Sequence, residues 1–99
     1  MGIFSSLFGS SNKYATNSCY LSERDLLKIV THRLVRTLEP HEEAVVRETL
    51  LSARKNGKIS MHTIYERLSE LKRGGKISDN DRRSLMQLFE EHFGGDNCK

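Results

Sequence analysis

The second half of the chain contains two similar stretches, RKNGKIS at residues 54–60 and KRGGKIS at residues 72–78. In both, two basic residues precede a glycine, and an isoleucine is followed by a serine. Cations are favoured near helix C-termini, glycine permits the left-handed turn beyond a helix, and serine is a preferred N-cap. Each stretch therefore predicts the end of one helix and the beginning of the next.

Apolar spacing predicts one helix after Ser60 and another after Ser78. Residues three and four positions apart share a helical face, so apolar residues at these intervals mark a buried stripe. We expect Gly74 and Gly75 to end the first of these helices. The expected stripes consist of Met61, Ile64, Tyr65, Leu68 and Leu71 in the first helix, and of Leu85, Met86, Leu88, Phe89 and Phe93 in the second.

Two earlier helices are predicted from their cap residues. Ser22 is the N-cap of a helix that is expected to run to about Leu38. Pro40 suits the first turn of the next helix, and Gly57 supplies its left-handed stop. The expected inward faces consist of Leu26, Leu27, Val30, Leu34 and Leu38, and of Val45, Val46, Thr49, Leu50 and Ala53.

These elements predict an all-α fold, either a small four-helix bundle or paired helical hairpins behind a flexible N-terminal tail. The 99 residues are enough for one modest core, and we expect a tail at 1–20, a helical domain at 21–95 and a second tail at 96–99. Residues 1–20 are rich in Ser and Asn, which argues against their burying enough apolar surface to fold.

The chain begins MGIFSS at residues 1–6, which fits the signal for N-myristoylation of Gly2 once the methionine is removed. One acyl chain gives only reversible membrane binding, so stable attachment needs a second signal. Cys19 is a candidate palmitoylation site, and an ordinary free thiol is the alternative. No apolar run approaches the roughly 20 residues of a spanning helix. We therefore expect a cytoplasmic protein, peripheral on the cytosolic face of a membrane, with Cys19 and Cys98 reduced.

The basic turns have two interpretations. Helix-end chemistry alone explains them. Alternatively, lysines beside the free amides of helix N-termini bind phosphate or anionic headgroups, which would supply the second membrane signal. The candidate headgroup-binding residues are Arg54, Lys55, Lys58, Lys72, Arg73 and Lys76.

GKIS at residues 57–60 resembles the second half of an EF-hand loop, and the N-terminal signal is similar to that of myristoylated calcium sensors. The ligands do not match, because calcium requires several oxygen ligands, including a bidentate glutamate. The liganding positions of the first copy fall on Ser52, Arg54, Asn56 and Thr63, and those of the second on Glu70, Lys72, Gly74 and Asp81. The resemblance therefore implies at most a relative that binds no calcium, and we expect no metal site and no cofactor.

Catalytic and nucleic-acid signatures are weak. The chain contains no His-Glu-x-x-His motif, nucleophile elbow or phosphate-binding loop, so we predict no enzyme and no small-molecule substrate. Arg82 and Arg83 near the start of the last helix, after a short glycine-containing turn, allow a helix-turn-helix interpretation. The net charge of +3 argues against a dedicated nucleic-acid binder.

The sequence thus predicts a non-enzymatic, membrane-associated helical adaptor or scaffold that recruits a protein partner. Acylated signalling adaptors, and viral accessory proteins that act at host membranes, include small proteins of this layout. The comparison with them rests on the layout alone and on no family motif. A small helical nucleic-acid-binding module is the alternative, and an EF-hand relative that binds no calcium is a further one.

Overall fold

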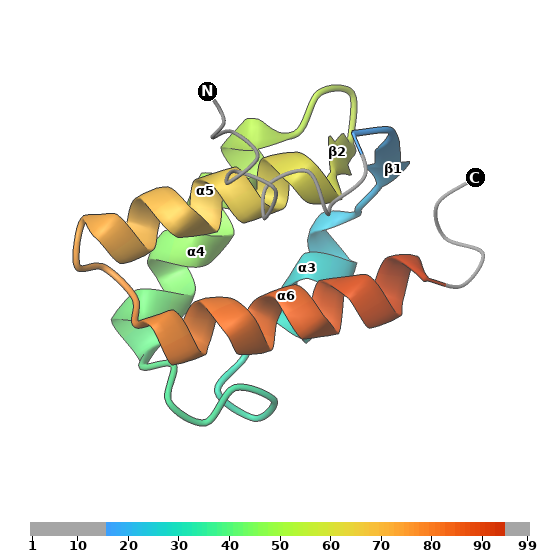
Figure 1. Cartoon of the computed structure of the whole chain (residues 1–99). Coiled ribbons are helices and arrows are strands. Elements are labelled where there is room, and N and C mark those ends of the chain that lie inside the picture. The colour runs from blue at the N-terminus through green and yellow to red at the C-terminus, as the bar shows by residue number, and fades with distance from the viewer. Residues whose placement is uncertain (1–15, 95–99) are drawn as a thin grey trace, which may run out of the picture.

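The computed structural model describes residues 16–94, and residues 1–15 and 95–99 lie outside the described part. The described chain is mostly helical. In order it forms β1 (Ser18–Tyr20), α3 (Glu23–Ile29), α4 (Pro40–Ala53), β2 (Lys58–Ser60), α5 (Met61–Arg73) and α6 (Asp79–Phe93), as Figure 1 shows. Helix α5 packs against α4 and α6, and the short α3 packs against α4 and α6.

Helices α5 and α6 begin and end where the serine and glycine residues predict. The Ser60 hydroxyl accepts a hydrogen bond from the Thr63 amide at 3.0 Å, and Ser78 caps α6 in the same way. Gly74 is the C-cap of α5, and Gly75 has a φ of +75°, which a residue with a Cβ rarely adopts. The cap signals at Ser60, Ser78 and Gly74-Gly75 are therefore confirmed.

A single apolar cluster fills the space between the helices. Leu68 of α5 and Phe89 of α6 are both 0% exposed and belong to this cluster, which confirms the two stripes. Tyr65, Leu71 and Leu88 are only partly buried and pack at its margin. The remaining buried hydrophobic residues are Cys19, Leu21, Leu26, Ile29, Val30, Val35, Leu38, Val46, Leu50, Ile59, Met61, Ile64, Ile77, Leu85, Met86 and Phe93.

The first predicted helix is wrong in its length. Helix α3 covers only Glu23–Ile29, and the residues after it turn back toward α4. Val30 leaves the helical region with a ψ of 84°, and the β-branched pair Val30-Thr31 gives the helix little intrinsic support at this point. Leu34, which was expected to be inward-facing, lies in the loop after α3 and is 53% exposed. Leu27, also expected to be inward-facing, lies within α3 on the side opposite Leu26 and Ile29 and is 46% exposed.

A two-stranded sheet, which the all-α prediction omits, joins the beginning of the described chain to its middle. Strands β1 and β2 are antiparallel, with Cys19 opposite Ile59. Among residues 16–94 the first element is therefore β1, which lies just before Leu21, the residue at which we expect the helical domain to begin. Leu21 itself is buried, and its amide donates to the carbonyl of Gly57 at 2.9 Å.

The turn before β2 is a hairpin turn rather than a simple helix stop. Lys55 and Lys58 exchange two backbone hydrogen bonds, and the two residues between them, Asn56 and Gly57, have φ values of 55° and 78°. This is the geometry of a type I′ turn, for which Asn-Gly is a preferred pair. A Cβ at Gly57 would also lie 2.9 Å from the ring of Tyr20, so the position requires glycine.

Helix α4 agrees with its prediction except at its end. Glu39 is the N-cap in a capping box with Glu42, and Pro40 occupies the first turn. Val46 and Leu50 are buried on its inner side. The helix ends at Ala53, so Arg54 is the C-cap and Lys55 lies beyond the helix, not in its last turn.

Candidate interaction surfaces

The structure divides the predicted headgroup-binding residues into two separate patches. Lys58 lies just before α5, whereas Lys72, Arg73 and Lys76 lie at its far end. Helix α5 has 13 residues, which corresponds to a length of about 20 Å. Figure 1 shows the two turns at opposite ends of this helix. The six residues therefore do not form one cluster.

Arg54 has a structural role in the folded domain. Its guanidinium Nη1 donates to the carbonyl of Leu21 at 2.8 Å, and its Nε is buried without a hydrogen-bond partner among residues 16–94. This contact fixes the chain just before α3 against the end of α4. Part of the hydrogen-bonding capacity of Arg54 is therefore used within the domain.

A polar groove of about 330 Å³ runs between α5 and α6. Arg82 lies over the Tyr65 ring, 5.4 Å from its centroid, and donates to the Ser69 hydroxyl at 3.1 Å. Arg82 also forms an ion pair with Asp79 at 2.7 Å. The groove is lined by Tyr65, Glu66, Ser69, Glu70, Arg73 and Arg82, so its charges are mixed.

The predicted lipidation sites have different outcomes. Gly2 lies outside the described residues. Cys19 is 3% exposed, so its sulfur is not open to acylation in this structure. Its burial follows from its place in β1, where its side chain faces the core opposite Ile59. Cys98 lies outside the described residues.

The early end of α3 creates a surface that the sequence did not predict. Leu27, Lys28, Thr31, Arg33 and Leu34 line an open hollow of about 370 Å³, and we call it the Leu27–Leu34 surface. Large apolar side chains exposed next to one another mark interaction sites more often than isolated ones do. The sequence signal for this surface is the mixture of leucines and basic residues in this stretch. The prediction of one continuous helix assigned both leucines to the core.

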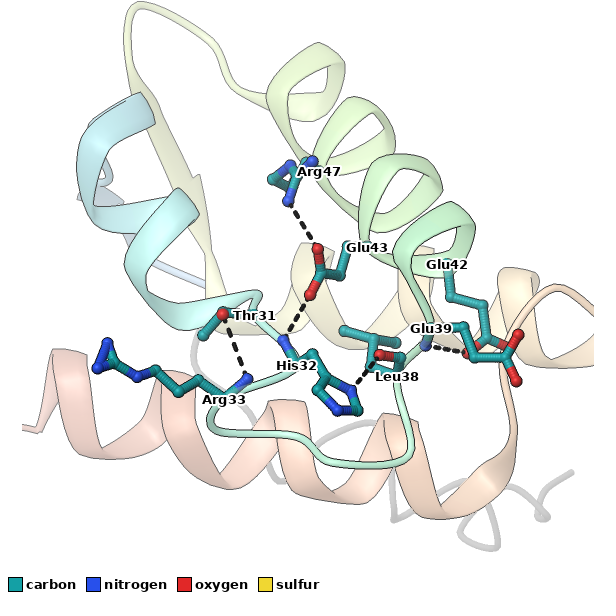
Figure 2. A network of polar contacts seen from close by, with 8 residues as sticks. All are labelled: Thr31, His32, Arg33, Leu38, Glu39, Glu42, Glu43 and Arg47. Carbon is teal, nitrogen blue, oxygen red and sulfur yellow. Dashed lines mark hydrogen bonds and ion pairs between the residues drawn. The ribbon is translucent and has the colours of Figure 1, made fainter.

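A network of polar contacts holds the loop that carries half of this surface (Figure 2). The backbone N–H of His32 donates to the carboxylate of Glu43 on α4, which also pairs with Arg47 at 3.4 Å. The Nδ1 atom of His32 lies 3.0 Å from the carbonyl of Leu38, a contact that requires the proton on this nitrogen. The loop is thereby fixed both to itself and to α4.

A second contact fixes the same loop to α6. The hydroxyl of Thr37 donates to the carboxylate of Asp81, which is 1% exposed. Asp81 also completes the capping box of α6, because it accepts from the Ser78 amide at 3.2 Å and its own amide donates to the Ser78 hydroxyl. Every carboxylate oxygen of this buried charge therefore has a donor.

Replacing Glu43 with alanine should loosen this loop without unfolding the domain. The change removes the acceptor of the His32 amide, and a partly exposed hydrogen bond of this kind contributes about 1 kcal/mol. Hydrogen exchange of the His32 amide should become several-fold faster. Glu48→Ala, at an exposed position of the same helix, is the matched control. Unchanged protection at His32 in the Glu43 variant would show that the network does not order the loop.

Metal and catalytic constellations are not evident among residues 16–94. No group of three His, Cys, Asp or Glu side chains in this part of the chain could hold a metal ion. His62 contacts Glu66 at 3.1 Å, and His92 contacts Asp25 at 3.8 Å. Within the same range, no helix has the length and apolar character needed to cross a bilayer.

Comparison with known proteins gives no family assignment. No protein-family model matches the chain, and searches of curated proteins and of solved structures also find no match.

Proposed function

We propose that this protein is a non-enzymatic adaptor, a small helical bundle that is attached to the cytosolic face of a membrane and holds a protein partner there. The proposal takes Met1 as the initiating residue and Gly2 as the site of myristoylation. The observation that carries it is MGIFSS at residues 1–6 ahead of a helical domain with a rigid, exposed apolar and basic surface. The groove between α5 and α6, which shares no residue with that surface, is the site proposed for the protein partner.

The alternative of nucleic-acid binding has less support. A reader of the major groove presents free cations from its recognition helix. Arg82 and Arg83 of α6 both form ion pairs with Asp79, at 2.7 and 3.6 Å. These pairs reduce the positive charge that α6 could present to a phosphate backbone.

The second alternative is a distant relation to EF-hand proteins, and one structural observation favours it. Strand β2 lies between α4 and α5, at the place where GKIS resembles the second half of an EF-hand loop. Arg54, at one of the liganding positions, instead contacts the Leu21 carbonyl. Such a relation would concern the shape of the domain and would leave the adaptor role unchanged.

The Gly2→Ala variant tests the proposal directly. Gly2 supplies the amine that accepts the acyl chain, so the variant should move from the membrane fraction to the soluble fraction of cells. Intact mass should show a myristoyl group on the wild-type protein and none on the variant. Gly9→Ala makes the same substitution outside the signal and should retain the modification. Wild-type protein without the added mass would remove the basis of the proposal.

A further inference from the structure

We propose that the Leu27–Leu34 surface docks onto an anionic lipid bilayer and is the second membrane attachment that a single acyl chain requires. This inference rests on the proposed membrane function and names the surface that serves it. It replaces the basic turns, which lie at opposite ends of α5, and Cys19, whose side chain is buried.

Helical geometry separates the two sides of α3. Leu26, Ile29 and Val30 face the core. Arg24, Leu27 and Lys28, three and four positions apart, share the opposite, exposed side of the helix. The following loop adds Arg33 and Leu34, both exposed and both in the lining of the same hollow. The outward side thus combines apolar and cationic groups, as surfaces that bind at the headgroup boundary do.

The cations of this surface are free to meet anionic headgroups. Among residues 16–94, neither Lys28 nor Arg33 forms an ion pair, whereas the nearby carboxylates are engaged elsewhere. Asp25 lies toward His92 on α6, and Glu43 contacts His32 and Arg47. Glu23, exposed at the first position of α3, is the acidic residue next to Arg24. The lining of the hollow itself contains two cations and no acid.

The rigidity of the loop favours docking. His32 and Thr37 fix the loop to α4 and α6, so Arg33 and Leu34 are already held beside α3 before any contact is made. A preorganised surface loses less conformational entropy on binding than a mobile one. The network of Figure 2 therefore has a direct consequence for affinity.

The chain before the described domain is long enough for both attachments to reach one bilayer. From Gly2 to Ala15, a fully extended chain spans roughly 45–50 Å. The longest dimension of the protein is 39 Å. The number of residues before the described domain is therefore compatible with an acyl group in the same bilayer that the Leu27–Leu34 surface contacts.

A bilayer fits this surface better than a second copy of the chain does. Two copies would bring Lys28 and Arg33 against the same cations of the partner, and like charges facing one another oppose association. An anionic bilayer offers negative headgroups to the cations and an apolar interior to the leucines. It also requires no shape that matches the hollow.

The test uses the full chain without an acyl group, so that only the protein surface is measured. Sedimentation with vesicles containing about 30 mol % phosphatidylserine is compared with neutral phosphatidylcholine vesicles. Lys28→Gln with Arg33→Gln should weaken binding to the anionic vesicles roughly thirty-fold, and the loss should shrink at high salt. Lys58→Gln with Lys76→Gln removes the same charge from the two basic turns and should weaken binding less than about three-fold.

A separate double variant tests the two leucines of the surface. Leu27→Ser with Leu34→Ser should weaken vesicle binding at least ten-fold, with a loss that persists at high salt because it is not electrostatic. Circular dichroism and the thermal midpoint verify that each variant is folded. An equal loss of vesicle binding in the two double variants that each remove two cations would overturn the proposal, because net charge alone would then explain binding. Self-association through Leu27 and Leu34, seen by analytical ultracentrifugation without vesicle binding, would also overturn it.

The two proposals fail in different measurements. Absence of a myristoyl group on Gly2 contradicts the proposed function, whereas the vesicle experiment needs no acyl group. Loss of the vesicle effect contradicts only the docking surface and leaves acylation intact.

Discussion

Replacing Phe89 with alanine should lower the free energy of unfolding by about 3–5 kcal/mol. The side chain is 0% exposed at the centre of the core, and its ring stacks near Phe93 with a centroid distance of 6.4 Å. Small domains have only about 5–15 kcal/mol of stability in total, so this loss removes much of the margin. Urea denaturation followed by circular dichroism measures the change.

A leucine pair supplies the matched control for the core. Leu68→Ala should cost about 2–5 kcal/mol, because its side chain is fully buried in the same cluster. Leu27→Ala makes the same chemical change at a half-exposed position, and the cost should stay within about 0.5 kcal/mol. Equal costs at the two positions would show that α3 is buried in solution and that the outward face described above is wrong.

Replacing Asp81 with alanine should cost about 2–4 kcal/mol, the largest effect expected outside the apolar core. The change removes the capping box of α6, which contributes about 1 kcal/mol. It also removes the hydrogen bond from the Thr37 hydroxyl to the carboxylate, which is part-buried, and a hydrogen bond to a charged group contributes about 1.5–3 kcal/mol. Chemical denaturation measures the loss, and hydrogen exchange should show faster opening of the loop that contains Thr37.

Asp79→Ala is the control for this change. Asp79 lies in the same first turn of α6, but its carboxylate is about half exposed and pairs with Arg82 and Arg83 at the surface. Exposed ion pairs contribute about 0–1 kcal/mol, so the variant should remain close to the wild type in stability. A loss at Asp79 as large as that at Asp81 would mean that general helix-dipole electrostatics, not the specific contacts of Asp81, stabilise the helix start.

The parts of the fold that follow from the sequence are those determined by neighbouring residues. Ser60, Ser78 and the glycines at 74–75 act within one turn of the helix that they begin or end, so their effect is visible in the chain itself. The stripes of Leu68 and Phe89 follow in the same way from helical spacing. Local chemistry was therefore sufficient for α5 and α6.

The parts that were missed depend on residues far apart in the chain. The weak helical support at Val30-Thr31 is local, but the contacts of Glu43 and Asp81 that hold the segment after α3 cannot be read from residues 22–38. The pairing of Cys19 with Ile59 is equally remote. Asn56-Gly57 did carry a hairpin signal, but its strands are too short to be recognised by alternation. The Leu27–Leu34 surface was missed because the loop that carries Arg33 and Leu34 is held in place by the contact with Glu43.

The β1–β2 ladder has a consequence for the order of events during synthesis. Ser18 pairs with Ser60, so the first strand has no partner until the middle of the chain has left the ribosome. The contacts of α4, α5 and α6 join neighbouring segments, and local contacts form faster than remote ones because less chain entropy is lost on closing them. The ladder therefore closes over Cys19 only after the middle of the chain has been synthesised.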